Sequence, residues 1–243
     1  MGRVECGPGD PMKKFDVLWI LVLAAVLAAF IYPESGKILL SLTASHPYLM
    51  GFAKFALLAS MGELLVLRMA KGSWVAPRGL PLRAIVWGLV GILIVLMFTL
   101  FSAGVAAAAS KGLLPLGSGR LAIFLQAFWT STLMNLTFGP AFMAAHRVSD
   151  AWIEARYAAR EGSARATAGM GGERKSPRLG EVVASIDWNR FFTFVVGKTI
   201  PLFWIPAHTI TFLLPGEYRV LVAALLSIAL GVILTWGNRS KTA

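Results

Sequence analysis

Residues 84–109 read AIVWGLVGILIVLMFTLFSAGVAAAA, a stretch of 26 positions without a charged side chain. About 20 apolar residues are enough for a helix to cross the roughly 30 Å hydrocarbon core of a bilayer. Inside hydrocarbon every backbone amide needs an internal partner, so a helix is favoured over an open sheet. The stretch therefore predicts a transmembrane helix and decides the class of the fold.

Similar apolar segments occur along the rest of the chain, at residues 15–32, 48–70, 121–145, 191–214 and 218–236. The 243 residues are 57% hydrophobic and 14% charged, and the mean hydropathy is +0.70. A water-soluble domain of this size could not hide so much apolar surface. We therefore predict an all-α polytopic transmembrane helix bundle of about six spans.

Lys and Arg gather on one side of these predicted spans. The chain has 23 of them against 12 Asp and Glu, a formal net charge of +11. Most lie in the N-terminus, the loops after the second and fourth spans, and the C-terminus. Because basic loops stay on the cytoplasmic side, we predict that both termini are cytoplasmic. The excess charge then reflects topology, and no nucleic-acid partner is expected.

The spans and loops give the organisation of the chain. It comprises an N-terminal cytoplasmic segment (1–14), membrane helices 1 to 4 (15–146), a basic cytoplasmic loop with a flexible linker (147–189), and membrane helices 5 and 6 with a short C-terminal tail (190–243). The first apolar segment follows Lys13 and Lys14 as in a signal peptide, but no small-x-small cleavage site follows it. We expect it to be a retained anchor.

Motifs for catalysis or cofactor binding are absent from the sequence. A single cysteine, Cys6, allows no intramolecular disulfide and no cysteine metal cluster. There is no phosphate-binding glycine loop, no His-Glu-x-x-His and no nucleophile-elbow serine. Neither an enzyme activity nor a cofactor or metal is expected.

Ionisable side chains fall inside two predicted spans: Lys54 and Glu63 in the second, Lys198 and His208 in the fifth. Such groups cost several kcal/mol in a membrane unless they are paired or wetted, so they are candidates for function. One interpretation is structural: Lys54 snorkels to the interface, and Glu63 forms a buried ion pair, with Lys198 as a candidate partner. The other is that Glu63 and Lys198 line a hydrated path.

Polar residues also mark the fourth span. Gln126, Thr130 and Thr137 lie on one stripe of the expected helix, and Asn135 faces the other way. Interhelical hydrogen bonds explain the stripe, although a polar lumen would use the same residues.

The fifth span has an irregular pattern. Pro201 and Pro206 each lack an amide donor and crowd the preceding turn, so we expect this helix to be kinked or locally unwound. Trp204, His208 and Thr211 lie on one face, where His208 and Thr211 can form hydrogen bonds.

Several short motifs occur in a fixed order over residues 37–236. They are His46-Pro47, Gly62-Glu63, Gln126 in a basic segment, Trp204 with His208, Thr211 and Phe212, then Pro215 with Arg219, and Leu234-Thr235-Trp236. In this order the chain resembles the family of the twenty-two-kilodalton peroxisomal membrane protein and its Mpv-seventeen relatives. The family's Gly-Pro, His and Trp-Tyr have no counterparts around residues 95–101. The resemblance implies a small membrane protein that acts as a channel for ions or small solutes.

Two functions are compatible with these residues. The first is a channel or permeation pathway whose pore or polar core contains Glu63, Lys198, Gln126, Thr130, His208 and Thr211. The second is a non-conducting structural membrane protein, in which the same groups fix helix packing and the basic loop binds lipid or partners. We expect membrane lipids and a second copy of the chain as partners. A bacterial plasma (inner) membrane is the favoured location, with the mitochondrial inner and peroxisomal membranes as alternatives.

Overall fold

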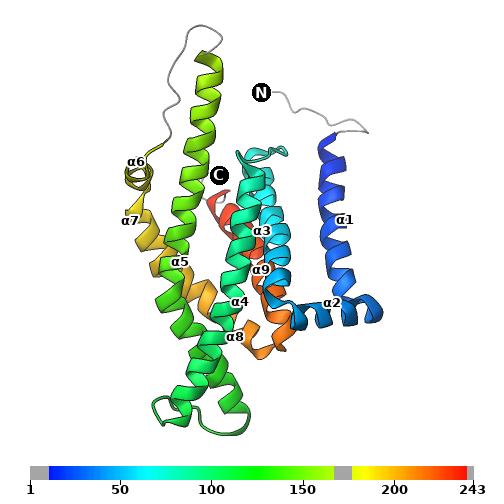
Figure 1. Cartoon of the computed structure of the whole chain (residues 1–243), viewed down its shortest axis with the longest axis vertical. Coiled ribbons are helices and arrows are strands. Elements are labelled where there is room, and N and C mark those ends of the chain that lie inside the picture. The colour runs from blue at the N-terminus through cyan, green and yellow to red at the C-terminus, as the bar shows by residue number, and fades with distance from the viewer. Residues whose placement is uncertain (1–10, 167–176, 240–243) are drawn as a thin grey trace.

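The computed structural model describes residues 11–166 and 177–239, and every regular element in those ranges is a helix (Figure 1). In chain order they are α1 (Pro11–Ile31), α2 (Pro33–Ser45), α3 (Pro47–Lys71), α4 (Leu80–Ser110), α5 (Gly119–Ala166), α6 (Leu179–Ala184), α7 (Trp188–Arg190), η1 (Phe191–Trp204), α8 (Ile205–Leu213) and α9 (Gly216–Arg239). The predicted flexible linker covers residues 162–177 and therefore begins inside α5. Its residues 167–176 lie outside the described ranges.

Five helices among the described residues are long and apolar enough to cross a membrane. They are Lys14–Ile31, Pro47–Lys71, Leu80–Ser110, Gly119–Arg160 and Gly216–Trp236. The prediction of a multi-span, all-α membrane protein is therefore confirmed. The longest helix, α5, has 48 residues and unites the predicted fourth span with the polar stretch that follows it.

The remaining predicted span, 191–214, is helical but divided into two pieces. η1 is a π-helix of 14 residues, and it runs directly into α8, which has 9. Pro201 lies inside η1 and Pro206 in the first turn of α8, so the expected distortion is confirmed. Together the two pieces run from the upper to the lower half of the bundle in Figure 1.

Two prolines mark the starts of α2 and α3, and α2 lies between the first two predicted spans. Pro33 and Pro47 stand in the first turns of α2 and α3, where a missing amide hydrogen costs nothing. As a result α2 lies across the lower ends of its neighbours (Figure 1). α1 is tied to α3 by Trp19 Nε1, which donates to the Met61 carbonyl at 3.0 Å.

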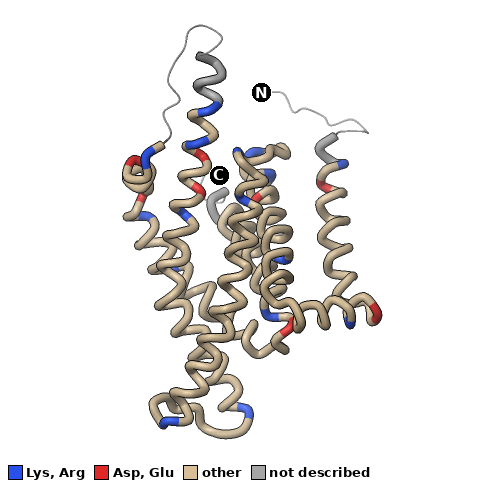
Figure 2. The backbone as a smooth tube through the Cα atoms, viewed as in Figure 1, with Lys and Arg blue, Asp and Glu red and all other residues tan. Residues whose placement is uncertain are grey.

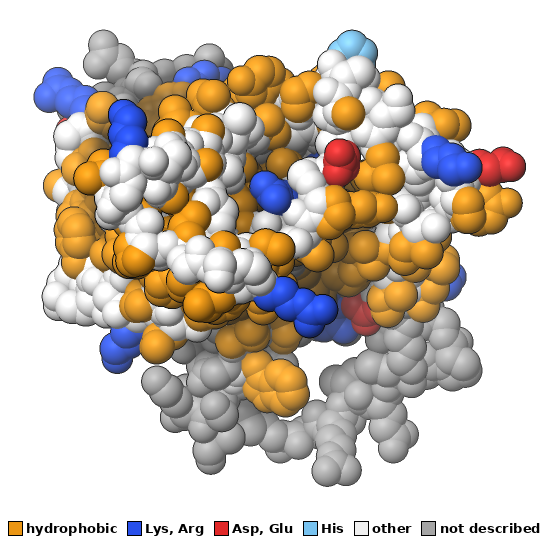
Figure 3. Space-filling view, turned by 90° about the horizontal axis from the view of Figure 1, so that it is seen from below, with side chains coloured by type: hydrophobic (Ala, Val, Ile, Leu, Met, Phe, Trp, Pro, Cys, Tyr) orange, Lys and Arg blue, Asp and Glu red, His pale blue; other side chains and the backbone are white. Residues whose placement is uncertain are grey.

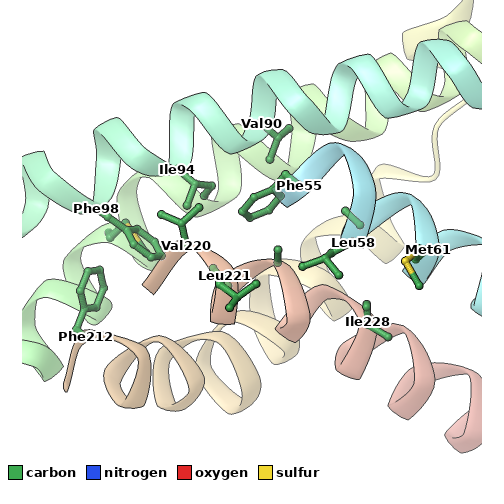
Figure 4. Packing of buried hydrophobic residues seen from close by; sticks show 14 of the residues in the cluster. Phe55, Leu58, Met61, Val90, Ile94, Phe98, Phe212, Val220, Leu221 and Ile228 are labelled. Carbon is green, nitrogen blue, oxygen red and sulfur yellow. The ribbon is translucent and has the colours of Figure 1, made fainter. Parts of the chain in front are cut away.

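The hydrophobic core surrounds α3, which packs against both α4 and α9. Gly51 and Gly91 let the α3 and α4 backbones meet closely, since a Cβ on Gly51 would lie 2.9 Å from the Gly91 carbonyl oxygen. Figure 4 shows the buried side chains between these helices; they include Phe55, Leu58, Met61, Val90, Ile94, Phe98, Phe212, Val220, Leu221 and Ile228.

Charged side chains lie mainly toward the ends of the helices, and the upper end of the bundle carries many of the Lys and Arg (Figure 2). Viewed from below, hydrophobic side chains cover much of the surface, and the charged ones are scattered among them (Figure 3). Such a surface suits a lipid environment.

Candidate functional site

A network of charged side chains joins α3, α4 and α5 near the upper end of the bundle. Arg83 Nη1 lies 2.7 Å from Glu63 Oε1 and 3.0 Å from Asp150 Oδ1, and Nη2 lies 3.6 Å from Glu154 Oε2. Arg83 is only 8% exposed. We call these four residues the Arg83 network. The partner of Glu63 is therefore Arg83 rather than Lys198, which was one interpretation of the sequence.

Lys198 lies on η1 with an exposed side chain and makes no ion pair within the described residues. It lines none of the three cavities described below. Sequence reasoning missed the Arg83 network because it assigned Arg83 to a loop, whereas α4 begins at Leu80. One signal was available: His146, Asp150 and Glu154 follow each other at four-residue spacing, on one face of α5.

A cavity of about 290 Å³, the His208 cavity, extends from this network into the middle of the bundle. Its lining includes Trp87, Asn135, His146, Asp150, Trp204 and His208. Asn135 and His208 are both buried, and Asn135 Nδ2 lies 3.1 Å from His208 Nδ1. Asn135 is thus buried, whereas Thr137, which shares the predicted stripe with Gln126 and Thr130, is exposed.

Some polar atoms in the lining of the His208 cavity have no partner in the part of the chain that the structure describes. The Trp204 indole stacks on the His208 ring with centroids 5.0 Å apart, yet its Nε1 donor is buried and unpaired. His146 Nδ1 is in the same condition. Because buried polar groups are nearly always satisfied, these atoms favour water or a polar solute in the cavity.

A second cavity of about 570 Å³, the Lys54 cavity, lies at the lower end between α2, α3, α4 and α9. Its charged lining residues are Lys54, Glu217 and Arg219. Lys54 is 5% exposed, and its Nζ donates to Thr43 Oγ1 on α2 at 2.9 Å. Lys54 is therefore held inside the bundle by α2, near the lower end of α3.

A third cavity of about 460 Å³, the Gln126 cavity, adjoins the second, because Ser102 and Arg219 line both. Gln126 Nε2 donates to the Ser102 carbonyl at 3.1 Å and so joins α5 to α4. Thr130 is buried in the same lining, and its hydroxyl donates to the Gln126 carbonyl. Two of the predicted polar-core residues thus share one cavity.

An apolar layer separates the His208 cavity from the two lower cavities. Phe55 and Ile94 line the former, whereas Phe98 lines the Lys54 cavity and Phe212 the Gln126 cavity. Figure 4 shows the Phe98 and Phe212 side chains next to each other. Their ring centroids are 4.8 Å apart. We call these four residues the Phe98 layer. Each is at most 7% exposed, and the His208 cavity shares no lining residue with the two lower cavities.

The other residues from the sequence motifs fall at diverse places. Thr211 is fully buried, but its hydroxyl donates to Ala207 in its own helix, and it lines none of the three cavities. Gly62 lies against α9, where a Cβ would come within 3.0 Å of Ile228. The remaining motif positions are His46 and Pro47 at the α2–α3 junction, Pro215 between α8 and α9, and Trp236, which is 71% exposed.

The arrangement defines a class: an integral, multi-span helical membrane protein with charged and polar groups enclosed in its bundle. Comparison with known proteins adds no narrower assignment, because no family model, no curated protein and no solved structure matches the chain. The resemblance to the Mpv-seventeen family therefore stays a prediction from short motifs.

Proposed function

We propose that this chain is a channel or permeation pathway for ions or small solutes, held closed by the Phe98 layer. The observation that carries the proposal is the pair of cavity systems on opposite sides of that layer, each with polar side chains in its lining. The His208 cavity lies on the side of the Arg83 network, and the Lys54 and Gln126 cavities lie on the other. Polar linings inside otherwise apolar spans are typical of solute pathways.

The broken helix supports the same proposal. Discontinuous helices often stand at the binding sites of membrane transport proteins, where irregular backbone faces a cavity rather than lipid. Here the junction of η1 and α8 contributes Trp204 and His208 to a cavity lining. Hydrophobic constrictions close channels by excluding water, and the Phe98 layer has that composition. The resemblance to the Mpv-seventeen family points to the same function.

Conductance across a planar bilayer tests the proposal. Phe98→Ala removes the ring that contacts Phe212, so it should raise the open probability or the flux at least about tenfold, which corresponds to roughly 1.4 kcal/mol of gating free energy. Phe124→Ala is the matched control, because Phe124 is 47% exposed on α5 and lies outside the layer. A folded Phe98→Ala protein with no more flux than Phe124→Ala would contradict the proposal.

A non-conducting structural protein is the second candidate, and the Arg83 network favours it. The network joins three helices, and Ser131 Oγ bonds the Ile205 carbonyl at 2.7 Å to join α5 to the broken helix. In this view the enclosed polar groups only fix helix register. It predicts that substitutions there reduce stability while no variant, Phe98→Ala included, ever conducts.

The placement in the cell is part of the proposal. By the distribution of basic residues, the end with the Arg83 network faces the cytoplasm, together with both termini and the loop between α5 and α6. We assign the chain to a bacterial plasma membrane, with lipids around it and a second copy of the chain as a partner. The basic loop is then available to anionic lipid headgroups.

A further inference from the structure

The Lys54 cavity contains two cationic side chains that have no carboxylate partner. Neither Lys54 nor Arg219 forms an ion pair in residues 11–166 and 177–239, although both line the same 570 Å³ space. Glu217 also lines the cavity and attracts Arg219 electrostatically, but its side chain is exposed and it forms a salt bridge with neither cation. A buried cation is normally matched by an anion. Because Lys54 is buried and Arg219 half-buried without a salt bridge, the cavity carries excess positive charge that an anion would neutralise.

Lys54 lines the cavity and uses only part of its hydrogen-bonding capacity on other protein groups. Its ammonium has three donors, and one of them is used by Thr43 Oγ1 at 2.9 Å. The nearest aromatic face is Phe30, whose ring centroid lies 5.2 Å from Nζ. An acceptor inside the cavity can therefore take a further hydrogen bond, and α2 holds the ammonium in place through Thr43.

Arg219 and the start of α9 add to the positive character. The Arg219 Nε donates to the Leu214 carbonyl at 2.9 Å, and the guanidinium lies 5.6 Å from the Phe212 ring centroid. This fixes the group between the Lys54 and Gln126 cavities with its other N–H donors still available. Gly216, the first residue of the 24-residue helix α9, also lines the cavity, and helix N-termini favour anions.

We propose that the Lys54 cavity binds a small oxyanion, a phosphate or carboxylate group held by Lys54 and Arg219. The cavity volume lies within the ordinary range for small-ligand sites, about 300 to 1,000 Å³. If the proposed pathway exists, a small oxyanion is the class of solute that it carries, and this part of the inference rests on the proposed function. Binding itself is measured without conductance, so the two proposals fail separately.

The test is binding of inorganic phosphate to the purified full chain in phosphatidylcholine nanodiscs, titrated at constant ionic strength against chloride. Saturable binding is expected, weakened about tenfold by Lys54→Gln and by Arg219→Gln, because each variant removes one charge-assisted hydrogen bond. Lys54→Arg should retain most of it. Lys111→Gln is the matched control, because Lys111 is exposed near the same end and lines no described cavity.

A second arm identifies the source of the oxyanion. Native mass spectrometry of protein taken from phosphatidylglycerol membranes should show either no retained lipid, which means a soluble oxyanion, or one lipid lost in Lys54→Gln, which means a headgroup phosphate. The first result supports the site only together with phosphate binding, and the second supports it by itself. Absence of phosphate binding together with absence of Lys54-dependent lipid would overturn it, as would an equal loss in Lys111→Gln. If Lys54→Gln does not fold, Arg219→Gln decides alone.

Discussion

Arg83 shows how one charged side chain can hold three helices together. Its guanidinium bonds carboxylates from α3 and α5 while its Nε donates to the Arg78 carbonyl at 3.0 Å. The planar, permanently charged guanidinium suits such a shared position better than an ammonium would. Removing Arg83 would leave the carboxylates of Glu63 and Asp150 without their shared guanidinium partner.

We predict that Arg83→Gln lowers the free energy of unfolding by about 2 to 3 kcal/mol, more than Glu63→Gln does. The order follows because Glu63→Gln still leaves Arg83 paired with Asp150, whereas Arg83→Gln takes the guanidinium from both acids. Within the described residues, Glu63 then keeps only the Trp87 Nε1 donor at 3.5 Å, and Asp150 keeps only His146 Nε2 at 3.6 Å. Unfolding in lipid micelles measures the difference, with Arg120→Gln as the exposed control. A larger loss of unfolding free energy in Glu63→Gln than in Arg83→Gln would contradict the central position of Arg83 in the network.

The individual partners could not be read from the sequence. Glu63 and His208 stood out as polar groups in apolar runs, and the structure buries His208 and half-buries Glu63. Their partners, Arg83 and Asn135, come from other helices, and which faces meet depends on how the helices rotate and cross. Asn135 and Thr137 show the limit of helical spacing: it placed them on different faces of one helix, but only packing decided that Asn135 is buried and Thr137 exposed.

At the scale of elements, the junction of η1 and α8 depends on a side chain from α5. Pro201 and Pro206 remove amide donors, and the backbone there is wound as a π-helix. Ser131, which is fully buried, donates its hydroxyl to the Ile205 carbonyl at 2.7 Å. It thus pins the irregular stretch to the straight helix beside it.

Ser131→Ala should cost about 1 kcal/mol of stability, the usual scale of an interhelical hydrogen bond in membranes. It should also increase hydrogen exchange at the junction residues Phe203 to Ala207. Ser149→Ala is the matched control, since that hydroxyl donates only within its own helix, to His146. Equal effects from the two substitutions would show that Ser131 does not fix the junction.

Long helices were the most predictable elements, because length and hydropathy alone determine them. The shorter and irregular elements were less so. α2 was missed because its 13 residues are too mixed in polarity to read as a span, although Pro33 and Pro47 marked its boundaries. The prolines predicted a distortion in residues 191–214. They did not predict that 14 of these residues form a π-helix, because no short sequence pattern distinguishes a π-helix from a kinked α-helix here.

At the scale of the whole molecule, the bundle has two polar regions and one apolar barrier between them. The Arg83 network and His208 cavity lie above the barrier, and the Lys54 and Gln126 cavities lie below it. This division could not be foreseen from the sequence, since Phe55, Ile94, Phe98 and Phe212 resemble ordinary core residues. The barrier role proposed for them depends only on their positions between the cavities.

The central claim, two water-filled halves separated by the Phe98 layer, is tested by cysteine accessibility in reconstituted vesicles. In a Cys6→Ser background, single cysteines replace Ser227, which lines the His208 cavity, and Ser102, which lines the lower cavities. Ile210→Cys is the control, because Ile210 is 63% exposed on α8 and lines none of them. A membrane-impermeant thiol reagent is added from either side.

The account predicts that Ser227→Cys reacts only from the side of the Arg83 network and Ser102→Cys only from the opposite side. Adding Phe98→Ala should make each cysteine reactive from both sides, while Ile210→Cys stays inert throughout. The contrary result is that Ser227→Cys and Ser102→Cys are as unreactive as Ile210→Cys, or that Phe98→Ala leaves their sidedness unchanged.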